Sequence, residues 1–563
     1  MTAVDPVEQL TGPGGPFEIV AEEVLGIPLQ VYKTRMRSLR ELVEQNALRP
    51  DVDFLVQGDV RYTFGQHDAA ARTLAQSLAG LGVARGDRVA LCSANVPEWV
   101  ITFWACAILG ATVVPLNAWW KAEELEFGLN DSESKVLIGD ARRIASVHDR
   151  LPEIRALEHV FTFGTPEFDA LLAGDDPGMP TSPIDEDDVL AILYTSGTTG
   201  QPKGATITHR QAIANLQNII VLGIAAAMRG TPPPEASATL QACSLLVVPL
   251  FHVTGCLATM STSYATGGKI ALMPVGRFDP DVAMQTIETE KVTSIGGVPT
   301  VMWRILESPN LDKYDLTSVQ RASYGGAPAA PELVERIGQV FPQMRQTLTT
   351  AYGLTETASV ATAHGGADYF AHPGSVGKAA PTVEIKIVAA DGSDAPTGER
   401  GEVWIKGPTV MLRGYWRRPE VNAEVLTDGW FHTGDIGYVD TDGYLYLVDR
   451  AKDMIIRAGE NVYCVEVEHV LFEHPDVIDA AVVGVPHREL GEEVKAVVQL
   501  RDGANPDPEG IRAFCRQHLA DFKVPEYVEI RDEPLPRNPA GKVLKNLLRG
   551  GETSFAAADD QTL

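Results

Sequence analysis

The stretch "VLAILYTSGTTGQPKGA", residues 189–205, begins as an apolar strand and changes abruptly into a loop rich in Gly, Ser and Thr. Gly197, Gly200 and Gly204 allow the backbone to turn its N–H groups inward, and Lys203 adds a positive charge. The hydroxyl donors of the loop are Thr195, Ser196, Thr198 and Thr199. Attachment to a buried strand disfavours the alternative of a flexible linker. The stretch therefore predicts a polyphosphate-binding loop at the end of a strand. It is not a Walker A loop, because the chain contains no Gly-Lys-Ser/Thr, which excludes a generic P-loop ATPase.

Upstream of this loop, strand and helix patterns alternate. A hairpin over residues 54–64 turns at Gly58-Asp59, and Thr63 is expected to cap the helix that follows. We expect helices over residues 63–78, 96–109 and 121–129, and strands over residues 87–93, 111–116 and 135–139. This alternation predicts βαβ units and a parallel sheet covered on both faces. "GLGVARG", residues 80–86, superficially matches a dinucleotide fingerprint, but it follows a helix and precedes a strand, so we interpret it as a helix cap and turn.

The chain has 563 residues, which is too long for one small domain, and its texture changes along its length. An acidic, Pro-rich linker at 174–188 precedes a second alternating region that runs to about Tyr352. Residues 374–448 contain short strands with Gly turns and predict a β-rich subdomain. The predicted fold is α/β: a large N-terminal domain of doubly wound subdomains over residues 1–450, a small α+β C-terminal domain over 451–550, and a frayed tail over 551–563.

Composition narrows the classes of partner. Acidic residues outnumber basic ones 75 to 47, giving a net charge of -28, so a nucleic acid is not expected to bind. The negative charge of the whole chain still permits a small anionic ligand, because local N–H donors can outweigh the average repulsion. The six cysteines are dispersed, which predicts reduced, buried thiols rather than a disulfide scaffold or a zinc site.

Targeting signals are not evident in the sequence. The first nine residues are acidic and lack the basic and apolar regions of a signal peptide. Two uncharged stretches, residues 99–116 and 240–268, are interrupted by Gly, Pro, Ser or Thr and are interpreted as buried core rather than membrane spans. We therefore expect a cytoplasmic protein without a transmembrane segment. The sequence is compatible with a homodimer and leaves peripheral membrane association open.

Further motifs follow the loop in a definite order. They are "PLFHVTG" (249–255), "YGGAP" (324–328), "TTAYGLTET" (349–357), "TGD" (433–435), "DRAKDMI" (449–455) and "PRNPAGKVLK" (536–545). Together with the loop they resemble the signatures of the adenylate-forming superfamily of acyl-CoA synthetases, peptide-synthetase adenylation domains and beetle luciferases. The resemblance spans about residues 37–548, and among these enzymes the chain is most like a fatty-acid–CoA ligase.

The resemblance implies a two-step reaction that uses ATP, Mg²⁺ and CoA. A carboxylate attacks the α-phosphorus of ATP to give an acyl-AMP and pyrophosphate, and a thiolate then displaces AMP. Charge gathers at the α-phosphate in the first step, where positioned cations give the largest benefit. By resemblance, Lys542 is the cation that reaches the α-phosphate and the carboxylate, and Lys203 belongs to the phosphate loop. Glu356 would hold Mg²⁺, a hard cation suited to carboxylate and phosphate oxygens.

The nucleotide contacts are assigned in the same way. Tyr352 would lie against adenine, Asp435 would accept hydrogen bonds from both ribose hydroxyls, and Arg450 would contact ribose or phosphate. The supporting backbone is expected from Gly325, Gly326, Ala327, Gly353 and Thr355.

The resemblance also implies that the C-terminal domain rotates between the two steps, with Lys452 as the hinge. The loop at 457–463, which includes Gly459, would then form the pantetheine tunnel. Some relatives carry Lys near this position, whereas here Arg457 alone preserves the positive charge and is the residue expected to contact the CoA phosphates.

The segment around His252 bears on the acid that is activated. His252 resembles the pocket residue beside the acyl carboxylate, and amino-acid-activating relatives place an Asp in the segment that follows. Here that segment is "VTGCLATMSTSY", which has no acid to pair with a substrate ammonium. The small pocket residues are Thr254, Gly255, Gly297, Gly325 and Gly326. We expect a medium- or long-chain fatty acid or a bulky ring-bearing acid. The alternatives are an aryl-acid–CoA ligase, an acyl-AMP ligase that loads a carrier protein, and a luciferase-type oxidation.

Overall fold

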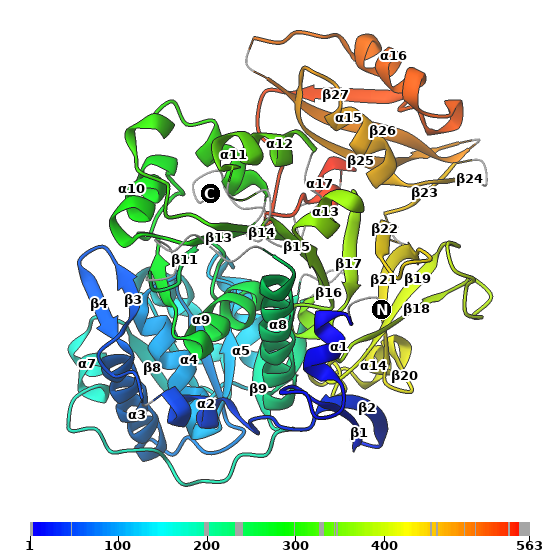
Figure 1. The fold of residues 1–563 in the computed structure, drawn as a ribbon. Coiled ribbons are helices and arrows are strands. Elements are labelled where there is room, and N and C mark those ends of the chain that lie inside the picture. Colours follow the sequence, from blue (N-terminus) through cyan, green and yellow to red (C-terminus); the bar gives the residue numbers. More distant parts are fainter. Residues whose placement is uncertain are drawn as a thin grey trace.

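The computed structural model describes residues 4–46, 48–195, 202–230, 240–297, 299–325, 331–342, 344, 347–450, 453–457, 460–488, 490–501, 503–538 and 541–550. Figure 1 shows layers of helix and sheet in the blue-to-yellow part of the chain and a smaller domain in its orange-to-red part. The expected α/β class, with a large N-terminal and a small C-terminal domain, is confirmed.

The first sheet has the strand order β10-β9-β6-β5-β7-β8. Its strands are β5 (Arg88–Cys92), β6 (Thr112–Pro115), β7 (Val136–Gly139), β8 (His159–Thr162), β9 (Val189–Thr195) and β10 (Lys203–Thr208). All neighbours are parallel except β9 and β10, which are antiparallel. Every residue of β6 and β7 is buried, because a parallel sheet is covered on both faces.

The second sheet has the order β18-β19-β21-β22-β17-β16-β15-β14-β13-β11-β12-β3-β4. Its first part consists of β3 (Asp53–Gln57), β4 (Val60–Thr63), β11 (Cys243–Leu246), β12 (Lys269–Leu272), β13 (Ser294–Gly297), β14 (Arg321–Gly325), β15 (Thr349–Tyr352) and β16 (Thr362–Gly365). Its second part consists of β17 (Ser375–Ala379), β18 (Glu384–Val388), β19 (Gly401–Lys406), β20 (Leu426–Thr427), β21 (Trp430–Val439) and β22 (Leu445–Arg450). The region that the sequence predicts to be β-rich thus continues this sheet through the pairing of β16 with β17.

Helices cover both sheets. The main apolar core lies between the sheets and takes side chains from α3 (Phe64–Gly80), α4 (Pro97–Leu109) and α8 (His209–Arg229). The outer face of the first sheet packs against α5 (Ala122–Ser132) and α6 (Ala141–Val147). The outer face of the second packs against α10 (Pro280–Glu290), α11 (Pro299–Leu306) and α12 (Pro331–Val340). Shorter helices are α2 (Leu39–Asn46), α7 (Pro166–Leu171), α9 (Thr262–Thr266), α13 (Ala367–Ala371) and α14 (Pro419–Val425).

Capping and glycine signals in the sequence correctly predicted where helix α3 begins and ends. Thr63 forms a reciprocal capping box with Gln66 at the start of α3, and Gly82 lies in the left-handed region just beyond its end. Residues 99–116, which the sequence predicts to be buried core, contribute to the buried helix α4 and strand β6. All six cysteines are free and buried, as expected.

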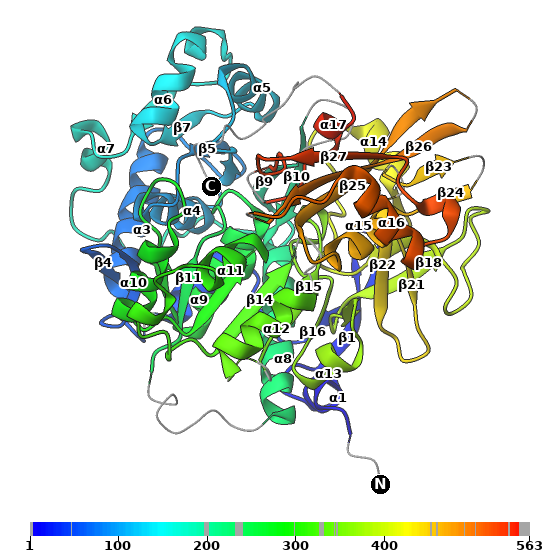
Figure 2. The ribbon, with the colours of Figure 1, turned by 90° about the horizontal axis from the view of Figure 1, so that it is seen from above.

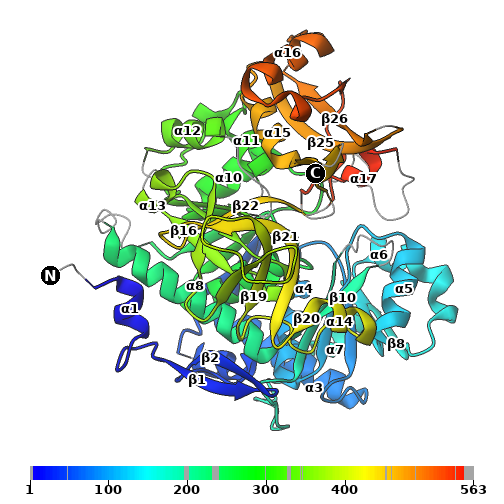
Figure 3. The same cartoon turned by 90° about the vertical axis from the view of Figure 1, so that its right-hand side faces the viewer.

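The C-terminal domain has its own sheet and core. Its strands are β23 (Ile455–Arg457), β24 (Glu460–Val462), β25 (Val477–His487), β26 (Gly491–Leu500) and β27 (Tyr527–Arg531). α15 (Cys464–Phe472) and α16 (Pro508–His518) pack on one side of the sheet. The short α17 (Lys545–Leu548) contributes to a separate cluster. Figures 1 and 3 show this domain on top of the large one, and Figure 2 looks down on it.

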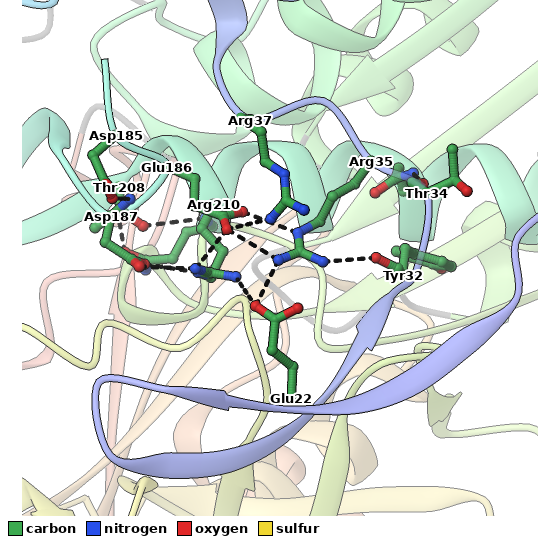
Figure 4. A network of polar contacts seen from close by, with 12 residues as sticks. Glu22, Tyr32, Thr34, Arg35, Arg37, Asp185, Glu186, Asp187, Thr208 and Arg210 are labelled. Carbon is green, nitrogen blue, oxygen red and sulfur yellow. Dashed lines mark hydrogen bonds and ion pairs between the residues drawn. The ribbon is translucent and has the colours of Figure 1, made fainter. Parts of the chain in front are cut away.

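An ion-pair network ties the N-terminal segment to the core. This segment comprises α1 (Pro6–Thr11), β1 (Ile19–Val24) and β2 (Ile27–Tyr32). Arg35, just after β2, donates two hydrogen bonds to Glu186, at 2.9 and 3.0 Å, and Arg210 of α8 pairs with the same carboxylate at 2.8 Å. Figure 4 shows Glu22 and Asp187 completing the network. The end of the predicted linker is therefore a fixed part of the fold, and it anchors α8.

By length and composition, α8 is the described helix that could cross a membrane, although 56% of its most apolar window is buried inside the protein. Its buried polar side chains bond to other segments. Gln211 donates to the Thr409 carbonyl at 3.1 Å, and Asn218 accepts from Tyr32 at 2.8 Å. These contacts are typical of a core helix.

Candidate functional site

Three neighbouring strands of the second sheet end beside one another at the predicted nucleotide motifs. β13, β14 and β15 are parallel, with Gly297 paired to Tyr324 and Gly325 paired to Ala351. Tyr352 ends β15 at the same edge. In open α/β sheets ligands bind outside the carboxyl ends of the strands. The register thus brings two motifs that are distant in sequence to one such edge.

The predicted phosphate loop joins the antiparallel strands β9 and β10. Thr195 and Lys203 are paired in register at its base, and the Thr195 hydroxyl donates to the Lys203 carbonyl at 3.4 Å. Several predicted site residues lie outside the described residues: Ser196, Gly197, Thr198, Thr199, Gly200, Gly326, Ala327, Lys452 and Gly459.

Tyr415 connects the phosphate loop to the predicted metal ligand. The Lys203 ammonium lies 5.6 Å from the centre of the Tyr415 ring, within the range of a cation–π contact. The Tyr415 hydroxyl donates to Oε1 of Glu356 at 2.6 Å. Glu356 is 8% exposed, so this charge-assisted hydrogen bond orients a largely desolvated carboxylate. Tyr415 lies in none of the motifs that predicted the site.

The loop after β15 has a constrained backbone. A Cβ atom at Gly353 would lie 1.4 Å from the Ser359 carbonyl oxygen, so no larger residue fits there. Ala358 and Ser359 have φ values of 52° and 107°, in the region that favours glycine. Thr355 begins the short 3₁₀ turn Thr355–Thr357 that contains Glu356. Strained backbone of this kind clusters at functional sites, where the surrounding structure maintains it.

Part of that support comes from α8. The side-chain oxygen of Asn215 accepts the N–H of Val360 at 3.1 Å, and Asn215 is fully buried. The same helix holds Thr409 through Gln211, close in sequence to Tyr415. Both segments that meet at Glu356 are therefore fixed by one helix. Gln211 and Asn215 were not among the predicted site residues, and the available signal was the set of amide side chains in this largely apolar helix.

A second polar contact joins Tyr352 to Asp435. The Tyr352 hydroxyl donates to Oδ2 of Asp435 at 2.6 Å, and Asp435 is 5% exposed. Its backbone N–H donates to the Thr433 hydroxyl at 3.0 Å. Asp435 in β21 is paired in register with Arg450 in β22. The predicted adenine, ribose and phosphate residues are thus brought to one place on two neighbouring strands and the end of β15.

His252 lies in the loop that follows β11, a neighbour of β13. Asn95 fixes this loop from the first sheet: its amide donates to the Val248 carbonyl at 3.0 Å and its oxygen accepts from the Leu250 N–H at 2.8 Å. The N–H of Thr254 donates to Nδ1 of His252 at 3.4 Å, which places the proton of the neutral ring on Nε2. Burial lowers the pKa of His252 to about 4. The imidazole is therefore neutral at pH 7.

This lowered pKa predicts a specific pH dependence of stability. Between pH 6.5 and about 4, the unfolded chain binds a proton at His252 that the native protein does not, so native stability rises with pH across this window. Between pH 7 and pH 5 the free energy of unfolding of the wild type should fall by about 2 kcal/mol more than that of His252→Gln. Thermal unfolding at several pH values measures this difference. The exposed His469→Gln is the control, and parallel pH profiles for wild type and His252→Gln would contradict the prediction.

The segment after His252 forms an unusually wide helical turn, the π-helix Thr254–Ser261. Such turns are rare and are frequent at functional sites. A Cβ atom at Gly255 would lie 2.2 Å from the Pro249 carbonyl oxygen, so glycine is required there by the close approach of backbone. Leu257 and Met260 point into the main core. The segment contains no charged side chain.

Lys542 and Arg457 belong to the C-terminal domain. The backbone of Lys542 is held in a tight turn, where its N–H donates to Asn538 Oδ1 at 2.9 Å. The Arg457 guanidinium makes two hydrogen bonds to Glu493, at 2.6 and 3.0 Å, and Glu493 is 2% exposed. The charge of Arg457 is thus paired with that of a buried carboxylate. A contact between Arg457 and the CoA phosphates stays a prediction.

Two family models match this chain. The AMP-binding enzyme model matches residues 42–416, and the AMP-binding enzyme C-terminal domain model matches residues 466–542. The first match includes the phosphate loop, Tyr352, Glu356 and Tyr415, and the second reaches Lys542.

Individual proteins agree with these matches. The chain is 36% identical over 510 residues to a feruloyl-CoA synthase of Amycolatopsis sp, covering 90% of this chain and 97% of that protein. It is 34% identical over 552 residues to a long-chain-fatty-acid–CoA ligase of Bacillus subtilis (strain 168), covering 92% and 95%. Among solved structures, ATP-bound MatB from Rhodopseudomonas palustris has a TM-score of 0.80 at 30% identity, covering 91% of this chain and 98% of that one.

Proposed function

Since the chain belongs to the AMP-binding enzyme family and is an ATP-binding, AMP-forming acid–CoA ligase, we propose that its acid is a medium- or long-chain fatty acid or a bulky apolar ring-bearing acid. The observation that supports this choice is the uncharged segment 253–264 after His252. A buried ammonium facing this segment would lack a carboxylate partner, and leaving such a charge unpaired is costly. An α-amino acid is therefore disfavoured, whereas an apolar acyl group is not.

An aryl acid is the second candidate, and one contact favours it. Trp119 packs edge to face against Phe251, the residue just before His252, with ring centroids 5.1 Å apart. Aromatic side chains in this arrangement can extend their packing to a planar ring of a ligand. The feruloyl-CoA synthase relative is consistent with this alternative.

In the proposed mechanism, residues of the large domain bind and orient ATP. Asp435 accepts hydrogen bonds from the ribose, Tyr352 lies against adenine while its hydroxyl holds Asp435, and Lys203 neutralises phosphate charge. Among the described residues no group of three or more His, Cys, Asp and Glu could hold a metal ion. One carboxylate suffices for Mg²⁺ when substrate phosphates supply further oxygens, so Glu356 fits the ion. Mg²⁺ bound there would neutralise charge that develops on the phosphates.

Lys542 supplies the remaining charge in the first step. The acid's carboxylate oxygen forms a bond to the α-phosphorus, the bond to pyrophosphate breaks, and the Lys542 ammonium stabilises the added negative charge. In the second step the CoA thiolate attacks the acyl carbonyl and AMP leaves. We place the boundary between the domains at residues 450–451 and the hinge at Lys452, so that rotation removes Lys542 and admits CoA.

Tyr415→Phe is expected to slow acyl-AMP formation about tenfold, because Glu356 loses a hydrogen bond to a charged acceptor, worth about 1.5–3 kcal/mol. Acid-dependent exchange of pyrophosphate into ATP, measured across Mg²⁺ concentrations, should show a raised Mg²⁺ requirement. Tyr438→Phe, in a tyrosine stacked on Tyr446 in β21 and β22, is the matched control. An unchanged exchange rate at all Mg²⁺ concentrations would argue against the role of Tyr415.

A panel of acids tests the proposed substrate class. The purified protein is given ATP, Mg²⁺ and CoA with acetate, amino acids, fatty acids of increasing length, cyclic aliphatic acids and hydroxycinnamic acids. Acyl-AMP and acyl-CoA are measured by mass spectrometry. We expect the highest kcat/KM with the longer fatty or ring-bearing acids. Turnover of acetate alone, or of amino acids alone, would refute the proposal.

A parallel panel tests the acceptor. CoA should consume the acyl-AMP. A carrier protein bearing phosphopantetheine, used in place of CoA, distinguishes a carrier-loading enzyme, and a requirement for oxygen would distinguish a luciferase-type oxidation.

A further inference from the structure

The turn that contains Lys542 is closed by a dense set of backbone contacts. Arg537 and Val543 form an antiparallel bridge, and the Asn538 N–H donates to the Lys542 carbonyl at 2.7 Å. Gly541, immediately before Lys542, has φ of 79°, which a residue with a Cβ rarely adopts. The backbone of Lys542 is thus defined from both sides within a few residues.

The side chain of Arg537 connects this turn to the sheet of the C-terminal domain. Its Nη2 lies within hydrogen-bonding distance of both carboxylate oxygens of Asp479 in β25, at 2.8 and 2.7 Å. A third hydrogen bond runs from Arg537 to the Gly541 carbonyl at 2.6 Å. Arg537 and Asp479 are both largely shielded from solvent. One planar group therefore fixes the peptide that precedes Lys542 relative to β25.

A second ion pair holds the chain just after the turn. Lys545 pairs with Glu468 of α15 at 2.8 Å, and the same carboxylate oxygen accepts the N–H of Val482 in β25 at 2.8 Å. The turn is therefore attached on both sides to one strand. Of the two attachments, only that of Arg537 reaches the turn itself, through Gly541.

We propose that Arg537, held by Asp479, is a positioning residue that fixes the Lys542 backbone for acyl-AMP formation. This inference rests on the proposed role of Lys542. A lysine side chain has a flexible four-carbon stem, so its ammonium can be positioned at the α-phosphate only if its backbone is fixed. Displacements of about 1 Å in a catalytic group can cost on the order of 100-fold in rate. In this proposal Arg537 acts through Lys542 and not by its own contact with nucleotide or acid.

Arg537→Lys separates positioning from charge. The ammonium keeps the positive charge, but its single nitrogen cannot take the places of both Nη2 at Asp479 and Nη1 at the Gly541 carbonyl. We expect kcat for acyl-AMP formation to fall about tenfold, with KM for ATP within twofold of wild type. Thioester formation from supplied acyl-AMP and CoA should stay within twofold. Asp479→Asn should reproduce this pattern, and it serves as the second variant if Arg537→Lys folds poorly. Arg531→Lys, at a partly exposed ion pair in the same domain, is the control.

A double-mutant cycle with Lys542→Ala decides whether Arg537 acts through the lysine. If it does, Arg537→Lys should change the residual acyl-AMP formation of Lys542→Ala by less than twofold. A full additional tenfold loss, or equal losses in both half-reactions of Arg537→Lys, would overturn the inference. Normal acyl-AMP formation by Arg537→Lys and Asp479→Asn beside an impaired Lys542→Ala would overturn this inference alone. Normal acyl-AMP formation by Lys542→Ala would instead overturn the proposed role of the lysine, and this inference with it.

Discussion

The Lys542→Ala variant is expected to lose acyl-AMP formation by at least about 100-fold, while it converts supplied acyl-AMP and CoA to acyl-CoA at close to the wild-type rate. The reason is that charge develops at the α-phosphate in the first step, where one positioned cation is worth about 3–4 kcal/mol. In the proposed second step the domain rotation has removed Lys542 from the reacting atoms. The two half-reactions are measured separately, by pyrophosphate exchange into ATP and by mass spectrometry of acyl-CoA.

Lys291→Ala is a suitable control, because that lysine forms an exposed ion pair with Asp315 in the large domain. It should leave both half-reactions unchanged. Equal loss of both half-reactions in Lys542→Ala would contradict the division of labour between the steps. It would indicate instead that Lys542 contributes to nucleotide binding or to the integrity of the domain.

Asp435→Asn is expected to impair both half-reactions, each by about 100-fold in kcat/KM. The ribose is bound in ATP and again in acyl-AMP, so the loss cannot be confined to one step. The amide replaces a carboxylate that is 5% exposed and that already accepts the Tyr352 hydroxyl, and two charge-assisted hydrogen bonds to the ribose are weakened together. The measurement is kcat/KM for ATP in the first step and for supplied acyl-AMP in the second.

Asp428→Asn provides the matched control. Asp428 lies exposed in the turn between β20 and β21 with φ of 51°, a conformation that asparagine tolerates. It should behave as wild type. If Asp435→Asn slowed the first step alone, the proposed ribose contact would be wrong. The result would indicate instead that Asp435 acts on the phosphates, which differ between ATP and acyl-AMP.

Elements with local signals were predictable from the sequence. Thr63 and Gln66 are three residues apart, and together they define the start of α3 regardless of what packs around it. The apolar runs that form β6 and β7 likewise indicated strands buried on both faces. The assignment of strands to sheets was not accessible in this way. β4, the second strand of the hairpin, and β5 are successive strands along the chain, yet they belong to different sheets.

The residues of the candidate site also fall into those that local sequence identifies and those that only contacts between distant segments identify. Glycines of the motifs could be read directly, because the contact that excludes a side chain at a position such as Gly353 comes from Ser359 in the same short loop. Tyr415 could not, because its hydrogen bond joins it to a residue 59 positions away. Arg457 shows the opposite case: a cation that the sequence suggested for phosphates is bound to Glu493, 36 residues along the chain.

By itself, then, the amino-acid sequence determined the kinds of chemistry that are present: a strand entering a hydroxyl- and glycine-rich loop, a Lys in a Pro/Gly turn, and a segment after His252 without charge. These properties belong to short stretches of chain, where neighbouring residues are joined by covalent bonds. Only the tertiary structure decided which groups the charged side chains meet: Arg537 pairs with the Asp479 carboxylate, and Lys203 lies over the ring of Tyr415. The physical reason is that electrostatic and hydrogen-bonding energies depend on distance through space and on burial, and folding sets both by packing distant segments together.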